Sequence, residues 1–372
     1  MSARSSMSNK SLYLKYRPVQ LDDIVGQKPV VATLKKASSN KEFSHAYLFS
    51  GNHGCGKTST ARILATLINC ENVKNGVVCG KCRPCRSIHE GASIDVIEVD
   101  GASNTGIDNA KSLVDSSKWS PNELKKKIFL VDECHQLSKA AISALLKTLE
   151  EPPEDVAFIL CTTDIGKILP TILSRCQRFN FTKIQSKDIA QRLTDIAKKE
   201  NIVIEPDACY SLAKLARGSM RDAIGYLEQI GTVAGGKNIN DASVLKYFGL
   251  ADRLGIINIV KSILSDNIPV LMDQINDMIM ASVDCKQILY EISEIFRNIM
   301  VIKAQNGQSN IIDLPDHEIN ELKKIGESLK LIQLIKLAHL FSDVDKKLSF
   351  NINERWITEA TLINCVASLR QQ

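Results

Sequence analysis

Eight residues from Gly51 to Thr58 have the composition of a loop that wraps around phosphate. They read Gly51-Asn52-His53-Gly54-Cys55-Gly56-Lys57-Thr58 and are followed by Ser59. Glycines let successive backbone N–H groups turn toward phosphate oxygens, and a helix N-terminus behind the loop adds a favourable dipole. In this pattern Lys57 is expected to reach the β- and γ-phosphates of ATP, and Thr58 to ligate Mg²⁺. The alternative is a glycine-rich turn without a ligand.

The segments on either side of this loop favour the phosphate-binding interpretation. Ala46 to Phe49 is an apolar run typical of a buried strand. Ile63, Leu64 and Leu67 then recur at helical spacing. A strand before the loop and a helix after it are the context that this motif requires.

Two adjacent carboxylates, Asp132 and Glu133, follow another apolar run, Ile128 to Val131. A strand that ends in two acids sets one beside a metal ion and the other beside an attacking water. Asp132 is expected to bind Mg²⁺, directly or through water, and Glu133 to orient and polarise the water that attacks the γ-phosphate. The alternatives are a solvated acidic pair and a kinase, although no acceptor-recognition motif favours a kinase.

Four of the 11 cysteines lie close together in the sequence. Cys70, Cys79, Cys82 and Cys85 follow the pattern C-x8-C-x2-C-x2-C. Four thiolates close a tetrahedral shell around Zn²⁺, so the metal is expected to hold an inserted knuckle rather than do chemistry. A redox thiol pair and unliganded thiols are the alternatives, but neither needs four cysteines at this spacing. Small buried apolar roles are expected for Cys55, Cys134, Cys161, Cys176, Cys209, Cys285 and Cys365.

Short apolar runs alternate with helical stretches as far as residue 183. Two more runs, Ile94 to Val99 and Ala157 to Cys161, complete a set of strands that are apolar on both faces. Such strands separated by helices indicate an α/β fold with a parallel sheet and right-handed crossovers. We predict one P-loop domain over 11–183, with the zinc insert at 70–85. Residues 1–10 are polar and rich in serine, and are expected to form a disordered arm.

Helical spacing dominates the rest of the chain. Ser186 is expected to cap a helix and Pro206 to fit a first helical turn. The second domain is expected to end at a turn formed by Gly235, Gly236 and Asn238. Residues 184–240 are therefore predicted to be a small all-helical domain. Apolar residues at helical spacing beyond Asp241 predict a third, helical domain over 241–372.

Composition allows two or three soluble domains and little more. The chain has 372 residues, with 44% hydrophobic and 24% charged, and a net charge of +5 permits contact with nucleic acid without requiring it. No apolar run approaches the roughly 20 residues that span a bilayer, and the first residues lack the core of a secretory signal. No membrane association and a cytoplasmic location are expected.

Further motifs carry a family resemblance across nearly the whole chain. They are Lys15-Tyr16-Arg17-Pro18, Ile24-Val25-Gly26-Gln27, Asp132-Glu133-Cys134-His135, Glu150-Glu151-Pro152-Pro153, Thr162-Thr163-Asp164, Ser174-Arg175-Cys176 and Gly218-Ser219-Met220-Arg221-Asp222-Ala223. Together with the cysteine knuckle, they make the chain resemble the tau/gamma family of bacterial clamp-loader ATPases. The resemblance implies an AAA+ domain, a helical lid and a helical collar. It is closest to the short, gamma-like form or to a piece of a longer chain.

The resemblance also implies roles for single residues. One of Thr162 and Thr163 senses the γ-phosphate, with Thr163 slightly favoured. Arg175 is an arginine finger that reaches the nucleotide site of a neighbouring subunit, the alternative being a surface ion pair. Arg221 touches the γ-phosphate in its own chain. Val25 and Gly26 line the adenine pocket through backbone contacts.

The function implied is that of an ATP-hydrolysing motor within the DNA polymerase III holoenzyme. It would assemble in a ring with copies of itself and with delta-type and delta-prime-type subunits, and load the sliding clamp onto primer-template DNA. Lys111 and Lys118 are candidate DNA contacts or a solvated face. One alternative is a structural subunit that binds nucleotide without hydrolysis, which the intact Lys57 and Glu133 disfavour. Another is a zinc-dependent nucleic-acid-binding module, which the lack of interleaved aromatic residues disfavours.

Overall fold

The computed structural model describes residues 11–103, 115–305, 312, 314, 316–342 and 353–370. The expected arm, 1–10, lies outside this part of the chain. The chain divides into two compact units, Met1–Ile202 with Leu212–Gly236, and Val203–Ser211 with Lys237–Gln372. Each unit has hydrophobic core residues of its own.

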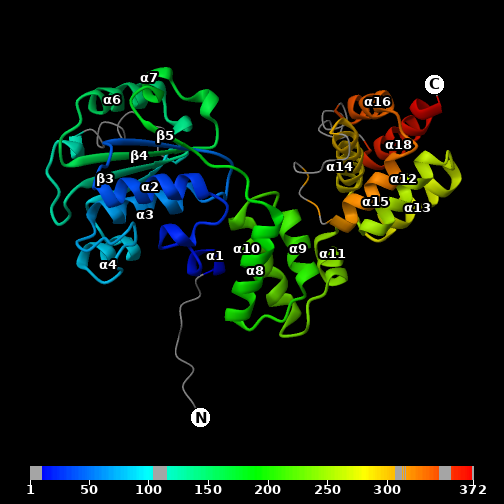
Figure 1. Ribbon diagram of the computed structural model, residues 1–372, viewed down its shortest axis with the longest axis horizontal. Coiled ribbons are helices and arrows are strands. Elements are labelled where there is room, and N and C mark those ends of the chain that lie inside the picture. The colour runs from blue at the N-terminus through cyan, green and yellow to red at the C-terminus, as the bar shows by residue number, and fades with distance from the viewer. Residues whose placement is uncertain are drawn as a thin grey trace, which may run out of the picture. The chain divides into compact units, whose positions relative to one another are not determined.

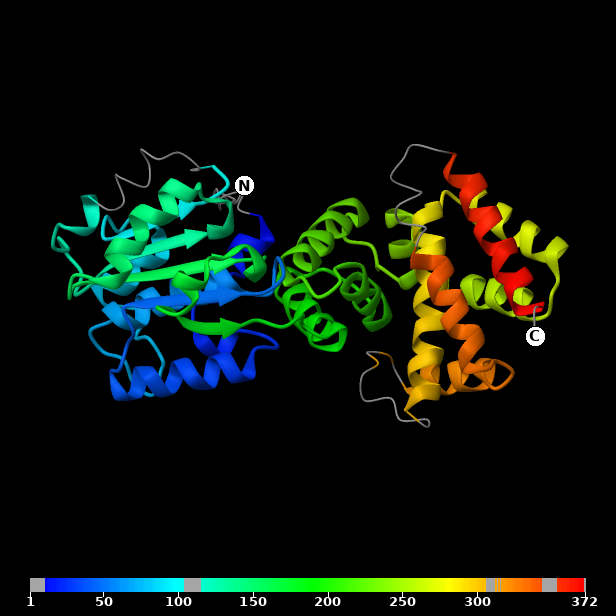
Figure 2. The same ribbon diagram turned by 90° about the horizontal axis from the view of Figure 1, so that it is seen from above.

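A five-stranded parallel sheet forms the centre of the first unit (Figure 2). Its strands are β1 (Ala46–Ser50), β2 (Val96–Asp100), β3 (Lys127–Asp132), β4 (Val156–Thr162) and β5 (Gln177–Asn180). They lie in the order β2-β3-β4-β1-β5. The three inner strands are buried along almost their whole length, as expected of strands covered on both faces. The predicted α/β class is confirmed.

The two edge strands differ from the sequence prediction. β2 begins at Val96 rather than at Ile94, whose side chain is 62% exposed. β5 was not predicted, because only Phe179 of its four residues is buried and no apolar run marks it. Edge strands bury less side-chain surface than inner ones, so their sequences carry a weaker signal.

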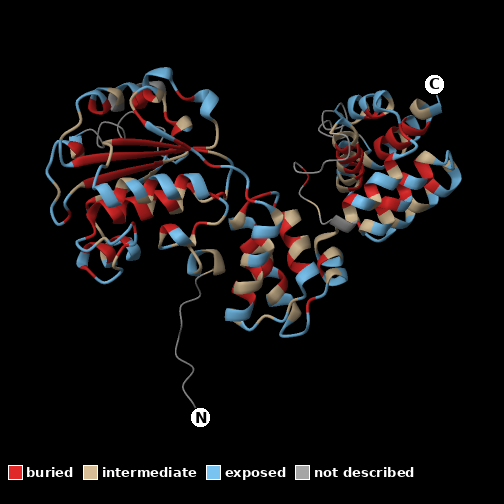
Figure 3. Ribbon diagram, in the orientation of Figure 1, coloured by how far each residue is buried: buried red, intermediate tan, exposed pale blue. Residues whose placement is uncertain are grey.

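Helices cover both faces of this sheet (Figure 1). α2 (Lys28–Asn40) and α3 (Lys57–Asn69) pack on one face, against Tyr47 and Phe49 of β1. α6 (Lys139–Glu150) and α7 (Pro170–Leu173) pack on the other, against Ala46 and Leu48. The alternation follows from the two-residue period of a strand, and Figure 3 shows the buried sides of these helices turned to the sheet. The remaining short elements before β5 are α1 (Leu12–Lys15), η1 (Leu21–Asp23), α4 (Arg83–Glu90), η2 (Cys134–Gln136) and η3 (Ile165–Lys167).

Parallel pairing brings the carboxyl ends of four strands to one edge of the sheet. Ser50 at the end of β1 pairs with Thr162 at the end of β4. Asp132 at the end of β3 pairs with Asp100 of β2. Ligands of open parallel sheets bind at the carboxyl ends of the strands, so a ligand site is expected among the loops that follow these strands.

Two long helices, α8 (Ser186–Glu200) and α10 (Met220–Ala234), complete the first unit. α8 begins at Ser186 as predicted, but Gln185 rather than Ser186 holds the cap position, and the Gln185 side chain makes no cap hydrogen bond. Pro206 is the first residue of α9 (Pro206–Leu215), as its fixed φ angle favours. α10 ends at Gly235, which has the left-handed conformation expected of a helix-ending glycine.

Helices alone form the described part of the second unit beyond residue 240. They are α11 (Asp241–Phe248), α12 (Arg253–Leu264), α13 (Ile268–Met280), α14 (Cys285–Ala304), α15 (Asp316–Gly326), α16 (Leu331–Ser342) and α18 (Glu354–Arg370). The apolar faces of these helices other than α11 share one core, to which α12 contributes Ile256 and Ile259 and α14 contributes Ile288 and Phe296. Among the described helices, none has the length and apolar character needed to cross a membrane.

Candidate nucleotide site and cysteine cluster

The predicted phosphate loop joins β1 to α3. Gly56 caps α3 with a φ of 104° and offers no side chain to its first turn, so the backbone N–H groups there can face an anion. A Cβ at Gly54 would lie 1.9 Å from Ser219 Oγ, and one at Gly51 would lie 2.3 Å from the carbonyl oxygen of Phe181. Both positions therefore require glycine for close approach.

The loop encloses the ammonium group of Lys57. Its Nζ donates to the carbonyl oxygens of Gly51 at 2.7 Å and Asn52 at 2.8 Å. The lysine is only 5% exposed. These contacts hold one positive charge inside the curve of the loop, where phosphate oxygens would replace the two carbonyl acceptors.

Thr58 and Asp132 meet at the end of β3. Thr58 Oγ1 donates to Asp132 Oδ2 at 2.7 Å. The two oxygens are hard ligands of the kind that Mg²⁺ prefers, and such sites commonly use one or two protein oxygens with phosphate oxygens and water. The pair predicted from the sequence as Mg²⁺ ligands is thus brought within hydrogen-bond distance.

Glu133 turns toward the end of β4. It has a positive φ of 45°, which is uncommon for a residue with a side chain and often found at functional sites. Its Oε2 accepts from Thr163 N at 3.2 Å and from Thr163 Oγ1 at 2.8 Å. Thr162 is fully buried, and its hydroxyl contacts His135 and the backbone of Asp164 instead. Of the two threonines, Thr163 is therefore the one that contacts the carboxylate.

A cavity of about 510 Å³ is lined by Lys57, Thr58, Asp132 and Glu133. Its volume is in the range of small-molecule sites. The lining residues from the predicted site are His53, Gly54, Cys55, Gly56, Lys57, Thr58, Ser59, Asp132, Glu133, Val25 and Arg221. Gly26, Gly51, Asn52 and Thr163 are not among its lining residues. Gly26 has a left-handed φ of 77°, and a Cβ at this position would lie 3.1 Å from Ile184 Cγ2. The backbone conformation and the close packing therefore favour glycine here.

The start of α10 contacts the phosphate loop directly. Met220 N donates to the carbonyl oxygen of Gly54 at 3.0 Å. The next residue, Arg221, has its guanidinium 5.0 Å from the ring centroid of Tyr13, within the range of a cation–π contact. Movement of α10 relative to the sheet would therefore be felt at the phosphate loop.

Arg175 lies after α7, and it is not among the residues that line this cavity. Its Nη2 is 2.6 Å from Glu150 Oε1, and its Nη1 donates to the carbonyl oxygen of Thr171 at 2.8 Å. The surface ion pair left open by the sequence is present in this single chain. A partly exposed pair of this kind is worth about 0–1 kcal/mol, so it does not fix the side chain strongly.

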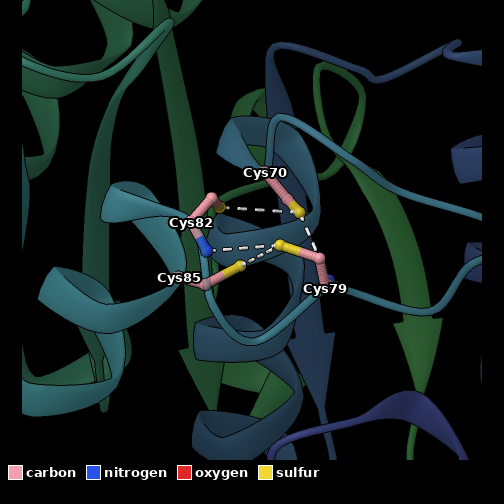
Figure 4. A group of neighbouring side chains, drawn as sticks. All are labelled: Cys70, Cys79, Cys82 and Cys85. Atoms are coloured by element: carbon pink, nitrogen blue, oxygen red, sulfur yellow. Dashed lines mark hydrogen bonds between the residues drawn. The ribbon is translucent and has the colours of Figure 1, made fainter.

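The four clustered cysteines converge between the end of α3 and the start of α4 (Figure 4). All four sulfur atoms lie within 4.8 Å of one another. Cys79 Sγ is 3.9 Å from Cys85 Sγ, and Cys82 Sγ is 3.9 Å from Cys70 Sγ. Tetrahedral Zn–S bonds of about 2.3 Å place sulfurs about 3.8 Å apart, so the cluster fits zinc.

Backbone donors also suit thiolates in this cluster. Cys79 N lies 3.4 Å from Cys70 Sγ, and Cys82 N lies 3.4 Å from Cys79 Sγ. The backbone N–H groups of Lys81 and Cys82 lower the pKa of the Cys79 thiol to about 6, whereas burial raises the pKa of the Cys70 and Cys85 thiols when no metal is bound. Donors that favour the charged form of sulfur are typical of the surroundings of a bound metal.

The scattered cysteines are buried as expected, with one exception. Cys55, Cys134, Cys161, Cys176, Cys209 and Cys365 are buried, whereas Cys285 is half-buried. Burial raises the pKa of Cys134 and of Cys161, which keeps these thiols neutral and unreactive.

Three family profiles match successive parts of the chain. The profile described as DNA polymerase III, delta subunit, matches residues 26–185. The DNA polymerase III clamp loader subunit, ATPase lid domain, matches 188–236. The profile of DNA polymerase III subunits gamma and tau domain III matches 239–371.

One relative matches over its whole length. The DNA polymerase III subunit gamma of Buchnera aphidicola subsp. Schizaphis graminum is 32% identical over 365 residues, which are 98% of this chain and 100% of the relative. The chain belongs to the DNA polymerase III gamma/tau family. The tau subunit of Bacillus subtilis is 34% identical over 98% of the chain, and that of Escherichia coli is 37% identical over 80%. The chain spans 64% and 46% of the lengths of these two relatives.

Sequence reasoning missed two arginines of this gamma/tau chain. Arg17 and Arg192 line the nucleotide cavity beside Arg221. Burial and the nearby Arg62 guanidinium lower the pKa of Arg17, which indicates crowded positive charge. Arg17 belongs to the motif Lys15 to Pro18, which indicated the family. The motif did not predict that Arg17 lines the cavity.

Only one of the two lysines predicted to contact DNA lies among the residues that the structure describes. Lys111 lies outside the described residues. Lys118 Nζ is 2.8 Å from Asp115 Oδ1, in an exposed pair three residues apart. A role for either lysine in DNA contact stays a prediction.

Proposed function

We propose that this chain is an ATP-hydrolysing motor subunit of a bacterial clamp loader, acting within the DNA polymerase III holoenzyme. The observation that carries the proposal is the single cavity that joins the Lys57 loop, the Thr58–Asp132 pair and Glu133. A match over the whole length of a gamma subunit supports the assignment to this assembly. ATP binding would organise the ring and open the sliding clamp, and hydrolysis would release the clamp on primer-template DNA.

Each group at the cavity has a role in this account. Lys57 and the backbone N–H groups at the start of α3 bind the β- and γ-phosphates. Thr58 and Asp132 would hold Mg²⁺, which when bound neutralises charge on the phosphate oxygens. Glu133 orients the attacking water and accepts its proton. Thr163, supported by its contact with Glu133, senses the γ-phosphate.

Groups on α10 and on the neighbouring chain complete the proposed site. Arg221 contacts the γ-phosphate from α10, so that ATP ties the lid to the sheet domain. Arg175 leaves Glu150 and reaches the nucleotide of the adjacent subunit, where it stabilises charge on the transferring phosphoryl group. Val25 contributes backbone contacts to the adenine.

The proposed organisation keeps the boundaries expected from the sequence. The P-loop domain covers 11–183, the lid 184–240 and the collar 241–372. Zn²⁺ bound by the four cysteine thiolates has a structural role, because their closed shell leaves no position for substrate. The partners are copies of this chain, delta-type and delta-prime-type subunits, the sliding clamp and primer-template DNA, in the cytoplasm.

ATP hydrolysis with defined partners tests this proposal. The chain is assembled with delta-type and delta-prime-type subunits, and phosphate release is measured with and without sliding clamp and primed DNA. We expect turnover to rise when clamp and DNA are both present, and the rise to disappear in Lys57→Ala. An assembled complex that binds ATP but gives the same negligible turnover under every condition would favour the non-hydrolysing structural subunit.

A further inference from the structure

His135 lies between the two strand ends that hold the catalytic groups. It follows β3 within η2, and its side chain is only 10% exposed. Its Nδ1 is 3.0 Å from Thr162 Oγ1, on β4, and 3.3 Å from Glu133 Oε2. One imidazole nitrogen thus contacts both the buried threonine and the carboxylate proposed to activate water.

The surrounding acceptors decide which tautomer this imidazole adopts. Thr162 Oγ1 is 3.1 Å from the carbonyl oxygen of Asp164, which can only accept. The single hydroxyl hydrogen of Thr162 satisfies that carbonyl, so the threonine oxygen accepts from His135. The Glu133 carboxylate also only accepts. Nδ1 must therefore carry the hydrogen, which is donated to Thr162 Oγ1, and Glu133 Oε2 lies 3.3 Å from the same nitrogen.

The two oxygens of Glu133 then have different surroundings. Oε2 accepts from two donors, Thr163 N and Thr163 Oγ1, and lies 3.3 Å from His135 Nδ1. Oε1 faces His53 Nδ1 at 3.5 Å, from a side chain that is 79% exposed. The Oε2 side is thus bonded to partly buried groups, whereas the Oε1 side faces an exposed histidine.

We propose that His135 is a positioning residue for Glu133. The two Thr163 donors bind Oε2 at the end of β4, and the His135 imidazole lies 3.3 Å from the same oxygen, which leaves Oε1 to accept the proton of the attacking water. Thr162 holds the imidazole in place and sets its tautomer. This inference rests on the proposed hydrolytic role of Glu133. It adds that the rate of hydrolysis, and not the binding of ATP, depends on the N–H donor of His135.

Other charged groups near the imidazole are few in the described part of the chain. Asp164 accepts from the Thr162 hydroxyl through its carbonyl oxygen, and the bond from Lys167 lowers the pKa of its carboxyl group. Lys167 Nζ is 3.2 Å from Asp164 Oδ2. His53 approaches Glu133 from the phosphate loop on the opposite side.

Two substitutions at His135 separate the effect of losing its N–H donor from the effect of changing its side-chain volume. His135→Leu fills similar space without a donor, and His135→Asn offers an amide N–H near the position of Nδ1. In the assembled complex we expect His135→Leu to lower kcat by ~10- to 100-fold, with KM for ATP unchanged within about twofold. His135→Asn should recover kcat to within about threefold of the parent. His45→Leu, before β1 and at the other edge of the sheet, is the control and should keep the parental kcat.

Nuclear magnetic resonance of the full chain supplies a readout that does not depend on activity. Nitrogen-15 labelling of histidine should show one histidine with a hydrogen on Nδ1 held by a hydrogen bond, and that signal should vanish in His135→Asn. The Nε2–H tautomer at His135 would overturn the proposal. So would a parental kcat in His135→Leu.

A variant of Glu133 separates failure of this inference from failure of the proposed function. If Glu133→Gln loses turnover while His135→Leu keeps it, Glu133 is catalytic and His135 does not position it. If Glu133→Gln keeps turnover, the hydrolytic role of Glu133 itself is wrong. If His135→Leu and His135→Asn lose ATP binding and kcat equally, the residue is merely structural, which also contradicts the proposal.

Discussion

The hydroxyl of Thr58 donates to the carboxylate of Asp132 across 2.7 Å, although the two residues are 74 positions apart in the sequence. This bond joins the start of α3 to the end of β3. Thr58 follows β1 and Asp132 ends β3, and these two strands are separated in the sheet by β4. The contact between the two side chains therefore depends on the parallel pairing of β1 with β4 and of β4 with β3. The fold thus brings a phosphate loop and an acidic strand end into one site.

Binding and hydrolysis of ATP should be separable by two substitutions. Lys57→Ala removes a ground-state contact with phosphate and is expected to weaken ATP binding. Glu133→Gln should keep binding and lower turnover by roughly 10² or more, the scale for losing a positioned base. Nucleotide binding by fluorescence titration and phosphate release by the assembled complex measure the two effects.

A surface carboxylate provides the control for these substitutions. Glu154→Gln changes an exposed residue just before β4 and should leave both binding and turnover unchanged. Parental turnover in Glu133→Gln would refute the role assigned to that carboxylate.

Zinc content tests the cysteine cluster. Freshly purified, reduced protein should contain about one zinc per chain, because four thiolates at this spacing form a closed site. Cys82→Ser should lose the metal, whereas Cys285→Ser, outside the cluster, should keep it. Elemental analysis that finds no zinc in the parent would disprove the assignment. Since the proposed role is structural, nucleotide should still bind to the Cys82→Ser protein.

The sequence predicted the chemistry of this site better than its surroundings. The Gly51 to Thr58 loop and the four cysteines were predicted because each motif lies in a short segment, where spacing alone determines what its residues can bind together. Inner strands were also predicted, since burial on both faces leaves a continuous apolar run.

Features that depend on tertiary neighbours escaped the sequence reasoning. Edge strand β5 carries only one buried side chain, and Gln185 caps α8 with no side-chain bond that a residue pattern would reveal. Arg192 lines the nucleotide cavity because α8 packs against α10, whose first residue contacts the phosphate loop, a placement with no local signal. The link from His135 to Thr162 joins two strand ends, and only the register of β3 and β4 defines it.

Asp95 should stabilise the edge of the sheet in a pH-dependent way. The residue is fully buried, and its carboxylate accepts the backbone N–H groups of Asn122, Glu123 and Leu124 at 2.7–2.9 Å. Burial raises its pKa, but the three donors outweigh burial, and the net pKa is lowered. The stabilisation is therefore complete above the unfolded pKa of about 4 and is lost as pH falls through the folded pKa.

Asp95→Asn should lower the free energy of unfolding by about 1–3 kcal/mol at neutral pH. The loss should shrink as the pH becomes acidic, because the parent then loses the same charge. Urea unfolding followed by Trp119 fluorescence, in a Trp356→Phe background, measures the difference. Asp115→Asn, at an exposed pair, should change stability by no more than about 0.5 kcal/mol. An Asp95→Asn loss that is equally large at acidic pH would contradict the charge-based explanation.

Hydrolysis at the boundary between two chains is the central claim of this account, and Arg175 is the residue that tests it. An arginine finger contributes about 10³ to 10⁵ in rate in other phosphoryl-transfer enzymes. Arg175→Ala should therefore bind ATP nearly as the parent does, yet assemble into a complex with severely reduced DNA-stimulated hydrolysis. Lys57→Ala should be inactive for the separate reason that its own phosphate loop is impaired.

The most direct measurement mixes these two inactive chains and follows hydrolysis by the assembled complex across a range of ratios. Some neighbouring pairs in a mixed ring join an intact Lys57 loop to an intact Arg175 from the adjacent chain. We predict that activity returns at intermediate ratios and is absent at both extremes. If Arg175 served only its own chain, every intact loop would still lack its finger. A flat, inactive response at all ratios, with assembly verified by size, would contradict the account and leave Arg175 as the partner of Glu150.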